Sequence, residues 1–360
     1  MSTNILACIS SHGFGHLGMT SPLLNALVEQ MDVSLIVRCT LPENIIRKRI
    51  HVPFELIPEK SDFGMVMTSA IDIDYSASFK SYVNFHDNWE ENLDKEKESL
   101  RRISPDLIIS NIPYITIVAA KELGIPCVAY CSLNWASIFE YCFKDRKEAI
   151  PILKQIRAAY SDANSFICPA PSMDMPFLKN IHRIGPIAEI GESKKSQILN
   201  GFFDSNYEKL VMISPGGIDT EINLNEWPKL PGIAWLVSWD DKLDRDDMLS
   251  TNQLNDSFTD VLTSCDAIIS KPGYGIVSES VCNAVPALFV KRGDWAEEPF
   301  LVNWWLKNGN ALEVSREDFF QGNVADHLQK LWKREKQTKQ VSCETDAVNK
   351  IAAMCNSSRN

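Results

Sequence analysis

Short hydrophobic runs recur along the whole chain, separated by stretches in which apolar residues follow a helical spacing. Runs of this length between turn residues are typical of buried parallel strands, and their alternation with helices predicts an α/β fold. In the first half we expect strands at 4–9, 33–38, 54–58, 106–110, 127–131 and 165–168, with 183–187 as the last segment of the first domain. In the second half we expect strands at 210–214, 233–237, 266–270, 287–290 and 311–314.

The helical spacing predicts helices at 22–30, 88–103, 115–123, 150–163, 258–264, 276–283 and 324–334. In 88–103 we expect Trp89, Leu93 and Leu100 to face inward, with the charged residues toward solvent. Residues 60–85 lack a regular pattern and are interpreted as a loop, whereas 347–354 can form one more helix.

The length and the repeated pattern predict two domains. At roughly 100–200 residues per domain, a chain of 360 residues favours two. Each half opens with a strand followed at once by a glycine-containing turn, as in doubly wound Rossmann-like folds. The polar segment 189–200 is interpreted as the linker. We therefore expect an N-terminal domain at 1–190, a C-terminal domain at 201–336, and a tail or helix at 337–360.

Composition and charge narrow the classes of protein to which the chain can belong. The net charge of −11 argues against a general nucleic-acid-binding protein, because such proteins need a basic surface. No apolar run reaches the ~18–20 residues of a membrane span, and the strand-like start does not resemble a signal peptide. The ten cysteines are scattered and form no CxxC pair, so we expect reduced thiols in a cytoplasmic protein.

A glycine-rich turn with two histidines follows the first expected strand and reads Ser10-Ser-His12-Gly13-Phe-Gly15-His16. Gly13 and Gly15 allow a ligand to approach the backbone closely. A histidine titrates near neutral pH, as a general base requires, and His16 is the candidate. His16 can instead cap the following helix or pack beside Phe14, and a loop histidine such as His12 is more often a structural hydrogen-bonding residue.

A second glycine turn, Lys271-Pro-Gly273-Tyr274-Gly275, lies between the expected strand at 266–270 and a helix. Free N–H groups and the helix dipole at such a turn favour an anion, typically a phosphate. Lys271 can add positive charge. Glu279, one turn into the helix, either reaches a ribose beside the phosphates or is an exposed carboxylate favoured by the dipole. A related turn, Ser214-Pro-Gly216-Gly217, is either a ligand contact or an ordinary turn.

The pattern Ser270-Lys-Pro-Gly-Tyr-Gly-x-x-Ser-Glu279, followed by an apolar strand, an acidic pair and Asn303, resembles the donor site of GT-B glycosyltransferases. The greatest similarity is to two groups. One comprises the family 28-like lipid-intermediate N-acetylglucosaminyltransferases of peptidoglycan synthesis, and the other is the glycosyltransferase-like N-terminal region of plant arabinokinases. The resemblance covers both ends of the chain and includes the Gly-x-Gly-His turn that ends at His16.

This resemblance implies a GT-B fold, with two Rossmann-like domains around a cleft, and transfer of a sugar from a UDP-linked donor to an acceptor hydroxyl with inversion. His16 would be the general base. The residues that would hold the nucleotide are Gly13, Gly15, Gly216, Gly217, Lys271, Gly273, Tyr274, Gly275 and Glu279. Glu297 and Glu298 would bind sugar hydroxyls, although the family more often has Gln there, which leaves the sugar open. Arg292 would neutralise phosphate or pair with these acids.

No metal and no further cofactor are expected, because a helix N-terminus and basic groups can stabilise a leaving diphosphate. The sequence contains no GxxxxGK[ST], GxSxG or HExxH motif. A DxD pair occurs at Asp72-Ile-Asp74 without a clear strand before it, unlike the metal-dependent GT-A enzymes.

Two other functions remain open. A nucleotide-sugar hydrolase of the pseudaminic-acid pathway type has the same Gly-Phe-Gly-His turn, in which His16 would deliver water. A non-catalytic nucleotide-sugar-binding protein would keep the donor site alone. The acceptor and the oligomeric state are not identified. A set of aromatic residues either faces the acceptor or belongs to the core, and it comprises Phe63, Tyr75, Tyr82, Phe85 and Trp89.

Overall fold

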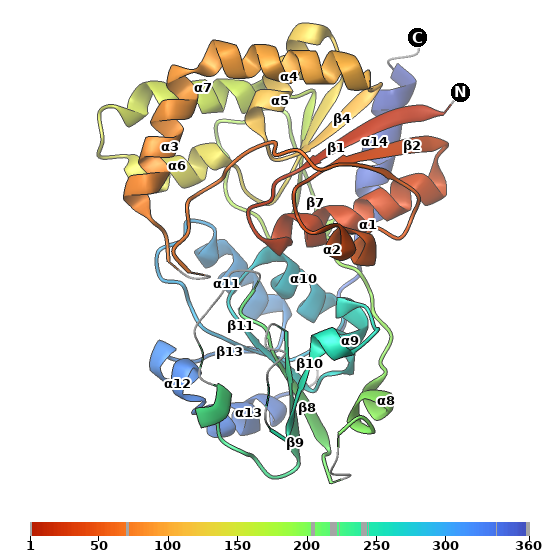
Figure 1. The fold of residues 1–360 in the computed structure, drawn as a ribbon, viewed down its shortest axis with the longest axis vertical. Helices are drawn as coiled ribbons and strands as arrows, with labels where there is room; N and C mark the ends of the chain where they lie inside the picture. The colour runs from red at the N-terminus through yellow and green to blue at the C-terminus, as the bar shows by residue number, and fades with distance from the viewer. Residues whose placement is uncertain are drawn as a thin grey trace.

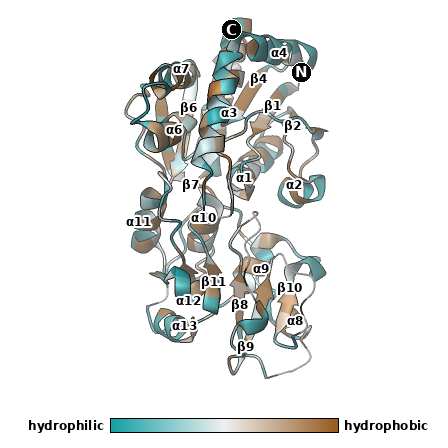
Figure 2. Ribbon diagram, turned by 60° about the vertical axis from the view of Figure 1, so that its left-hand side comes forward, coloured by the Kyte–Doolittle hydropathy of each residue, from teal (hydrophilic) through white to brown (hydrophobic). Residues whose placement is uncertain are grey.

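The structure is a computed structural model that describes residues 2–69, 72–202, 206–216, 222, 224–238, 243, 245–335 and 337–357, with side chains as far as 355. Two parallel β-sheets form two α/β domains, one above the other in Figure 1. Helices surround each sheet, so most strand residues are buried. Figure 2 shows the same arrangement, with hydrophobic residues concentrated in the strands and on the inner sides of the helices. The two-domain Rossmann-like architecture predicted from the sequence is confirmed.

The first sheet has the strand order β3-β2-β1-β4-β5-β6-β7, and all neighbouring strands are parallel. Its strands are β1 (Thr3–Ile9), β2 (Val33–Arg38), β3 (Glu55–Ile57), β4 (Leu107–Asn111), β5 (Cys127–Tyr130), β6 (Ser165–Ala170) and β7 (Ile181–Pro186). The chain runs outward from β1 to β3 and then returns to the other side of β1 with β4. Open α/β sheets bind ligands at the carboxyl ends of the strands at such a reversal.

The second sheet has the order β10-β9-β8-β11-β12-β13 and is also parallel. Its strands are β8 (Lys209–Ile213), β9 (Ile233–Val237), β10 (Met248–Ser250), β11 (Ala267–Ser270), β12 (Ala287–Phe289) and β13 (Ala311–Glu313). The reversal lies between β8 and β11, so Ser214 and Ser270 are adjacent there. Both expected glycine turns of this domain therefore leave the sheet at the same edge.

The helices of the first domain are α1 (Phe14–Gln30), α2 (Glu43–Arg49), α3 (Tyr75–Asp87), α4 (Trp89–Ile103), α5 (Tyr114–Leu123), α6 (Trp135–Phe143) and α7 (Ala149–Ser161). Those that follow are α8 (Lys195–Leu199), α9 (Phe258–Ser264), α10 (Tyr274–Cys282), α11 (Glu298–Asn308), α12 (Arg316–Gln321), α13 (Ala325–Trp332) and α14 (Glu344–Ser357). Trp89, Leu93 and Leu100 face inward from α4 as expected.

Some expectations about the helices are wrong. The loop expected at 60–85 gives way to α3 at Tyr75, because the side chain of Asp74 accepts the N–H of Ala77 and caps the helix. Helix α1 begins at Phe14, well before the expected start at 22, and includes two glycines that interrupt the apolar pattern. The sequence pattern also missed α2, α6, α11 and α12.

The last helix, α14, returns to the first domain. In Figure 1 it lies beside β1 and α1, far from the second sheet that precedes it in the chain. Ala347 and Ile351 are fully buried and belong to the same apolar cluster as the first sheet. Helix α14, within the expected C-terminal tail, therefore contributes to the core of the N-terminal domain.

The two domains contact each other through α1 and α10. A Cβ atom built on Gly18 of α1 would lie 3.9 Å from the Cα atom of Gly275 in α10, so the helices lie close together there. The hydroxyl of Tyr274 donates to the carbonyl oxygen of Ala170 at 3.0 Å and accepts the N–H of Ile187 at 3.1 Å. Tyr274 thus fixes the start of α10 against the end of the first sheet.

No helix in the described part of the chain is long and apolar enough to cross a membrane. The cysteines are free thiols, and all except Cys142 and Cys343 are buried. Across the described ranges, no three His, Cys, Asp or Glu side chains gather in a way that can hold a metal ion.

The docking of α14 provides a stability test. Ile351→Ala removes a fully buried side chain, and such truncations lower the free energy of unfolding by about 2–5 kcal/mol. Asn349→Ala, at an exposed position of the same helix, should change it by less than about 0.5 kcal/mol. Urea unfolding followed by circular dichroism measures both. Equal effects of the two substitutions would contradict the docking of α14 on the first domain.

Candidate functional site

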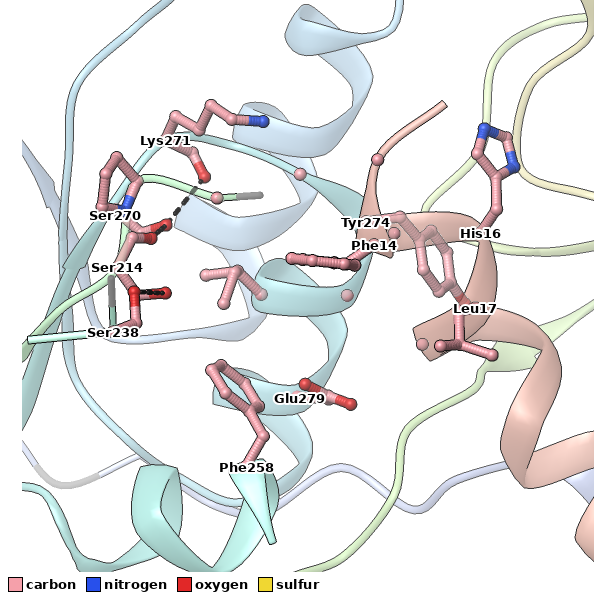
Figure 3. Close-up of a pocket in the computed structure, with 18 of the residues that line it drawn as sticks. Phe14, His16, Leu17, Ser214, Ser238, Phe258, Ser270, Lys271, Tyr274 and Glu279 are labelled. Atoms are coloured by element: carbon pink, nitrogen blue, oxygen red, sulfur yellow. Dashed lines mark hydrogen bonds between the residues drawn. The ribbon is translucent and has the colours of Figure 1, made fainter. Parts of the chain in front are cut away.

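A cavity of about 420 Å³ lies between the two domains. The β1–α1 turn and α2 line one side, and the second sheet, α9 and the β11–α10 turn line the other. Figure 3 shows His16 on the side of the first domain, with Lys271 and Glu279 on the side of the second. A cavity of this size and position is typical of a small-molecule site.

Helix α1 begins in this cavity without a side-chain cap. Its N-cap, Gly13, has a φ angle of 82°, which favours glycine, and the first turn contains no acidic residue. Gly13 and Gly15 both line the cavity. The N–H groups of a first helical turn have no partner within the helix, so this end of α1 can bind an anion.

His16 lies in the first turn of α1 and is 6% exposed. Its Nδ1 lies 2.7 Å from Oδ1 of Asn111, whose Nδ2 donates to the hydroxyl of Thr20 at 2.7 Å. That hydroxyl donates in turn to the carbonyl oxygen of His16 at 2.7 Å. Because the hydroxyl proton of Thr20 is used in this way, its oxygen must accept from Asn111, and the amide oxygen then faces His16. Nδ1 of His16 therefore carries the proton, and Nε2 keeps a lone pair.

His12 packs between two tryptophans. Its ring contacts Trp135 edge to face at 5.2 Å and stacks on Trp295 at 5.7 Å, measured between ring centroids. Burial lowers the pKa of His12 to about 3. Its Nε2 is sealed from solvent and has no hydrogen-bond partner among the described residues. This environment gives His12 a structural role, in which its ring packs against the two tryptophans.

Helix α10 also begins in the cavity without a side-chain cap. Gly273 is its N-cap, and Gly273, Tyr274 and Gly275 all line the cavity. Because the ring and hydroxyl of Tyr274 are used between the domains, only its backbone is available to a ligand. The first turn of α10 and that of α1 thus present N–H groups from opposite domains to one space.

Two cationic side chains, Lys271 and Arg292, line the cavity beside α10. Within the described residues, neither forms an ion pair with a carboxylate. Burial and then the neighbouring Arg292 lower the pKa of Lys271 well below its usual value. Burial also lowers the pKa of Arg292, whose guanidinium lies 5.0 Å from the centre of the Trp295 ring. Glu297 and Glu298 raise both pKa values but do not outweigh burial, so a bound anion would further stabilise the two charges.

Gly216 lies directly against Lys271. Its φ angle is 115°, and a Cβ atom built on it would lie 2.8 Å from Cε of Lys271, so a side chain here would displace the lysine. Gly217 lies outside the described residues. Figure 3 shows the hydroxyl of Ser270 bonded to the carbonyl oxygen of Ser214, which fixes the two glycine turns to each other.

Glu279 already has a partner from the first domain. Arg49, the last residue of α2, forms an ion pair with Glu279 through both carboxylate oxygens, and a second one with Glu189 at 3.1 Å. Glu279 is 1% exposed, and burial raises its pKa while Arg49 opposes that shift. The expectation of an exposed carboxylate is therefore wrong, and a ribose at Glu279 would share this carboxylate with Arg49 or displace it.

The two expected sugar-binding acids occupy different environments. Glu297 lines the cavity and accepts hydrogen bonds from the hydroxyl of Ser132 at 2.7 Å and from Nε1 of Trp295 at 3.3 Å. Glu298 does not line it, because its carboxylate accepts the backbone N–H groups of residues 292 and 293 at 2.6 and 3.2 Å. The structure thus brings Glu297, but not Glu298, into the candidate site.

Sequence reasoning missed Asn111 and Arg49. Asn111 ends β4 directly beside the end of β1, so a polar residue at that strand end was a usable signal. Arg49 ends a helix that the pattern did not predict, and no local feature indicates its reach to the second domain.

The expected aromatic wall does not line the large cavity. Tyr82 and Trp89 are buried in the core, and Phe63 and Phe85 pack against it. The hydroxyl of Tyr75 donates to Asp294 in the second domain. A second void beside Phe63, Tyr82 and Phe85 has a volume of about 10 Å³, too small for a sugar. The core reading of these residues is therefore favoured, with Tyr75 as an interdomain contact.

Comparison with known proteins agrees with this architecture. No protein-family model matches the chain. The L-arabinokinase of Arabidopsis thaliana is 25% identical over 327 residues, which cover 89% of this chain and 31% of that protein. The chain thus spans about a third of that relative's length.

Solved glycosyltransferase structures resemble the whole chain. The glycotransferase of kitacinnamycin has a TM-score of 0.62 and 15% identity, with 99% of this chain and 95% of that chain covered. Arabidopsis thaliana UGT89C1, solved with quercetin, has a TM-score of 0.62 and 13% identity, with 99% and 100% covered. At this identity the likeness shows the fold, which is GT-B as the sequence resemblance implied.

The charge of Lys271 gives a second prediction. Its folded-state pKa is below the unfolded value of about 10.4, so its protonated form opposes folding at neutral pH, and the penalty shrinks as pH rises toward that value. Lys271→Met should therefore raise the free energy of unfolding at pH 7, by the order of 1–3 kcal/mol, and by less at pH 9.5. Millimolar pyrophosphate should stabilise the wild type but not the Lys271→Met variant.

The matched control is Lys291→Met. Lys291 forms an exposed ion pair with Glu313 at 2.6 Å, so its removal changes the charge equally but should alter stability by less than about 1 kcal/mol. The control should keep the response to pyrophosphate. Thermal unfolding at both pH values, with and without pyrophosphate, measures these effects. A loss of stability in Lys271→Met at pH 7 would show that the ammonium is favourably paired.

Proposed function

We propose that the chain is a glycosyltransferase that moves a sugar from a nucleotide-sugar donor to an acceptor hydroxyl. The observation that carries this proposal is one interdomain cavity that is lined both by a histidine whose Nδ1 is held by Asn111 and by an uncapped helix N-terminus with two buried cations beside it. The histidine, His16, belongs to one domain, and the cations, Lys271 and Arg292, belong to the other. An acid–base group facing an anion site fits transfer from a phosphate-linked donor.

The donor diphosphate would bind at the start of α10. Backbone N–H groups at Gly273, Tyr274 and Gly275 would bond its oxygens, and Lys271 and Arg292 would neutralise its charge. When the sugar leaves, negative charge increases on the diphosphate, and these groups stabilise that charge. We therefore extend the proposal to a metal-independent reaction.

His16 would act as the general base. Its Nε2 takes the proton of the acceptor hydroxyl, the oxygen attacks the anomeric carbon, and the bond from that carbon to the diphosphate oxygen breaks. Attack from the face opposite the leaving diphosphate inverts the anomeric configuration. Asn111 acts as a positioning residue, because its amide holds the proton on Nδ1 and keeps Nε2 free.

The remaining contacts concern the sugar and the nucleoside. Glu297 keeps acceptor capacity beyond its bonds to Ser132 and Trp295, so it can bind a sugar hydroxyl. Glu279 and Phe258 line the part of the cavity in which a ribose and a base would lie. A UDP-linked donor rests on the sequence resemblance. The names of the similar structures, glycotransferases of small molecules among them, support the transferase class.

Hydrolysis of the donor is the second candidate. The observation behind it is that none of the aromatic residues considered for the acceptor lines the cavity beside His16. The test measures stabilisation by UDP, GDP, dTDP and their sugars, and then turnover of the stabilising donor with and without sugar and phenolic acceptors. Turnover that requires an acceptor supports transfer, and an equal rate in water alone supports hydrolysis. Lack of stabilisation by every nucleotide would overturn both.

His16→Ala gives the third prediction. Loss of a general base typically lowers the rate about 10²–10⁴-fold. The dissociation constant of the nucleoside diphosphate should change by less than about threefold, because the protein groups proposed to bind the diphosphate lie in the other domain. His182→Ala, at an exposed position, is the control and should keep the wild-type rate. Initial rates and calorimetric titration measure the two quantities.

A rate for His16→Ala close to that of the wild type would exclude His16 as the base. If wild type and variant both bind the nucleotide and neither turns it over, the chain is a non-catalytic nucleotide-sugar-binding protein.

A further inference from the structure

Arg49 extends from the first domain into the nucleoside end of the cavity. Its guanidinium bonds both oxygens of Glu279 and one oxygen of Glu189, and its Cζ lies 4.9 Å from the centre of the Phe258 ring. Arg49 is 15% exposed and Glu279 is 1% exposed. Arg49 therefore joins a buried carboxylate to an aromatic face across the domain boundary.

A nucleoside needs the same two groups. Glu279 lies one turn into α10 from the proposed diphosphate site, the place from which it can bond ribose hydroxyls. Phe258 offers a flat face for a base, and stacked rings have centroids about 4.5–7 Å apart. The guanidinium occupies that layer at 4.9 Å. Arg49 thus occupies positions at both groups that a nucleoside would use.

We propose that Arg49 is an internal competitor of the donor nucleoside, which binds only by displacing Arg49 from Glu279 and Phe258. This inference rests on the proposed function of the site as a nucleotide-sugar site. Displacement would break the ion pair between α2 and α10, so donor binding would change the contact between the domains. The measured affinity would then be lower than the intrinsic affinity of the open site.

Glu189 gives the displaced arginine a place to go. It lies between the domains, is 20% exposed, and already bonds Arg49 at 3.1 Å. Arg49 can therefore leave Glu279 without losing every counter-ion. Glu279 would exchange a charged partner for ribose hydroxyls, an exchange that opposes binding because its buried carboxylate is best stabilised by a cation.

The alternative is that Arg49 stays in place and binds the nucleotide directly. A guanidinium beside a phosphate site can form charge-assisted bonds with a phosphate. The two possibilities predict opposite effects of removing Arg49. Competition predicts tighter nucleotide binding in a variant without the guanidinium, and direct contact predicts weaker binding.

The test is calorimetric titration of the nucleoside diphosphate that stabilises the wild type most strongly among UDP, GDP and dTDP. We expect Arg49→Gln to bind it at least about fivefold more tightly than wild type, the lower end of typical coupling between linked events. Arg47→Gln removes an exposed arginine of the same helix that pairs with Glu43 and lies over the Phe54 ring, away from the cavity, and should bind within twofold of wild type. Circular dichroism checks that each variant is folded.

Arg49→Lys is the second variant, used if Arg49→Gln fails to fold. Lysine keeps the charge but cannot form the bidentate hydrogen bond to Glu279 or the planar contact with Phe258. The Arg49→Lys variant should therefore also bind the nucleoside diphosphate more tightly than wild type. Binding that is unchanged or weaker in the folded variant, with the wild type still binding, overturns the inference and leaves the proposed function standing. If no diphosphate binds either protein, the proposed function fails and the inference fails with it.

Discussion

The candidate site depends on the close packing of α1 against α10, one helix from each domain. Near Gly18 and Gly275 the two helices approach within van der Waals distance, and both N-termini open without a side-chain cap into one cavity. Tyr274 fixes this arrangement, because its hydroxyl bonds the backbone of the first domain. His16 and Lys271 lie on separate domains. Without that packing they would not line a common cavity.

Stability and binding place opposite demands on this cavity. Lys271 and Arg292 have depressed pKa values because burial disfavours their charge, and the nearby carboxylates of Glu297 and Glu298 offset only part of that effect. A protein optimised for stability alone would neutralise or replace the two cations. Their position beside an uncapped helix end is consistent with a site in which a bound anion supplies further negative charge.

Local pattern predicted the glycine turns and the described strands except the short edge strand β10, because buried parallel strands are continuous apolar runs bounded by turn residues. It failed for α1, where Gly15 and Gly18 lie inside a helix, and for α3, which starts from a cap at Asp74. The site residues on the turns were predictable for the same local reason. The roles of Glu279 and Glu298 were not, since they depend on an arginine from another domain and on the backbone of a loop.

Three carboxylates in or near the cavity accept hydrogen bonds from the first domain. Glu279 pairs with Arg49, Glu297 accepts from Ser132, and Asp294 accepts from the hydroxyls of Tyr75 and Tyr141. Each of these contacts crosses from one domain to the other. These carboxylates therefore link the two domains. A polyhydroxylated ligand that displaced any of their partners would also weaken a contact between the domains.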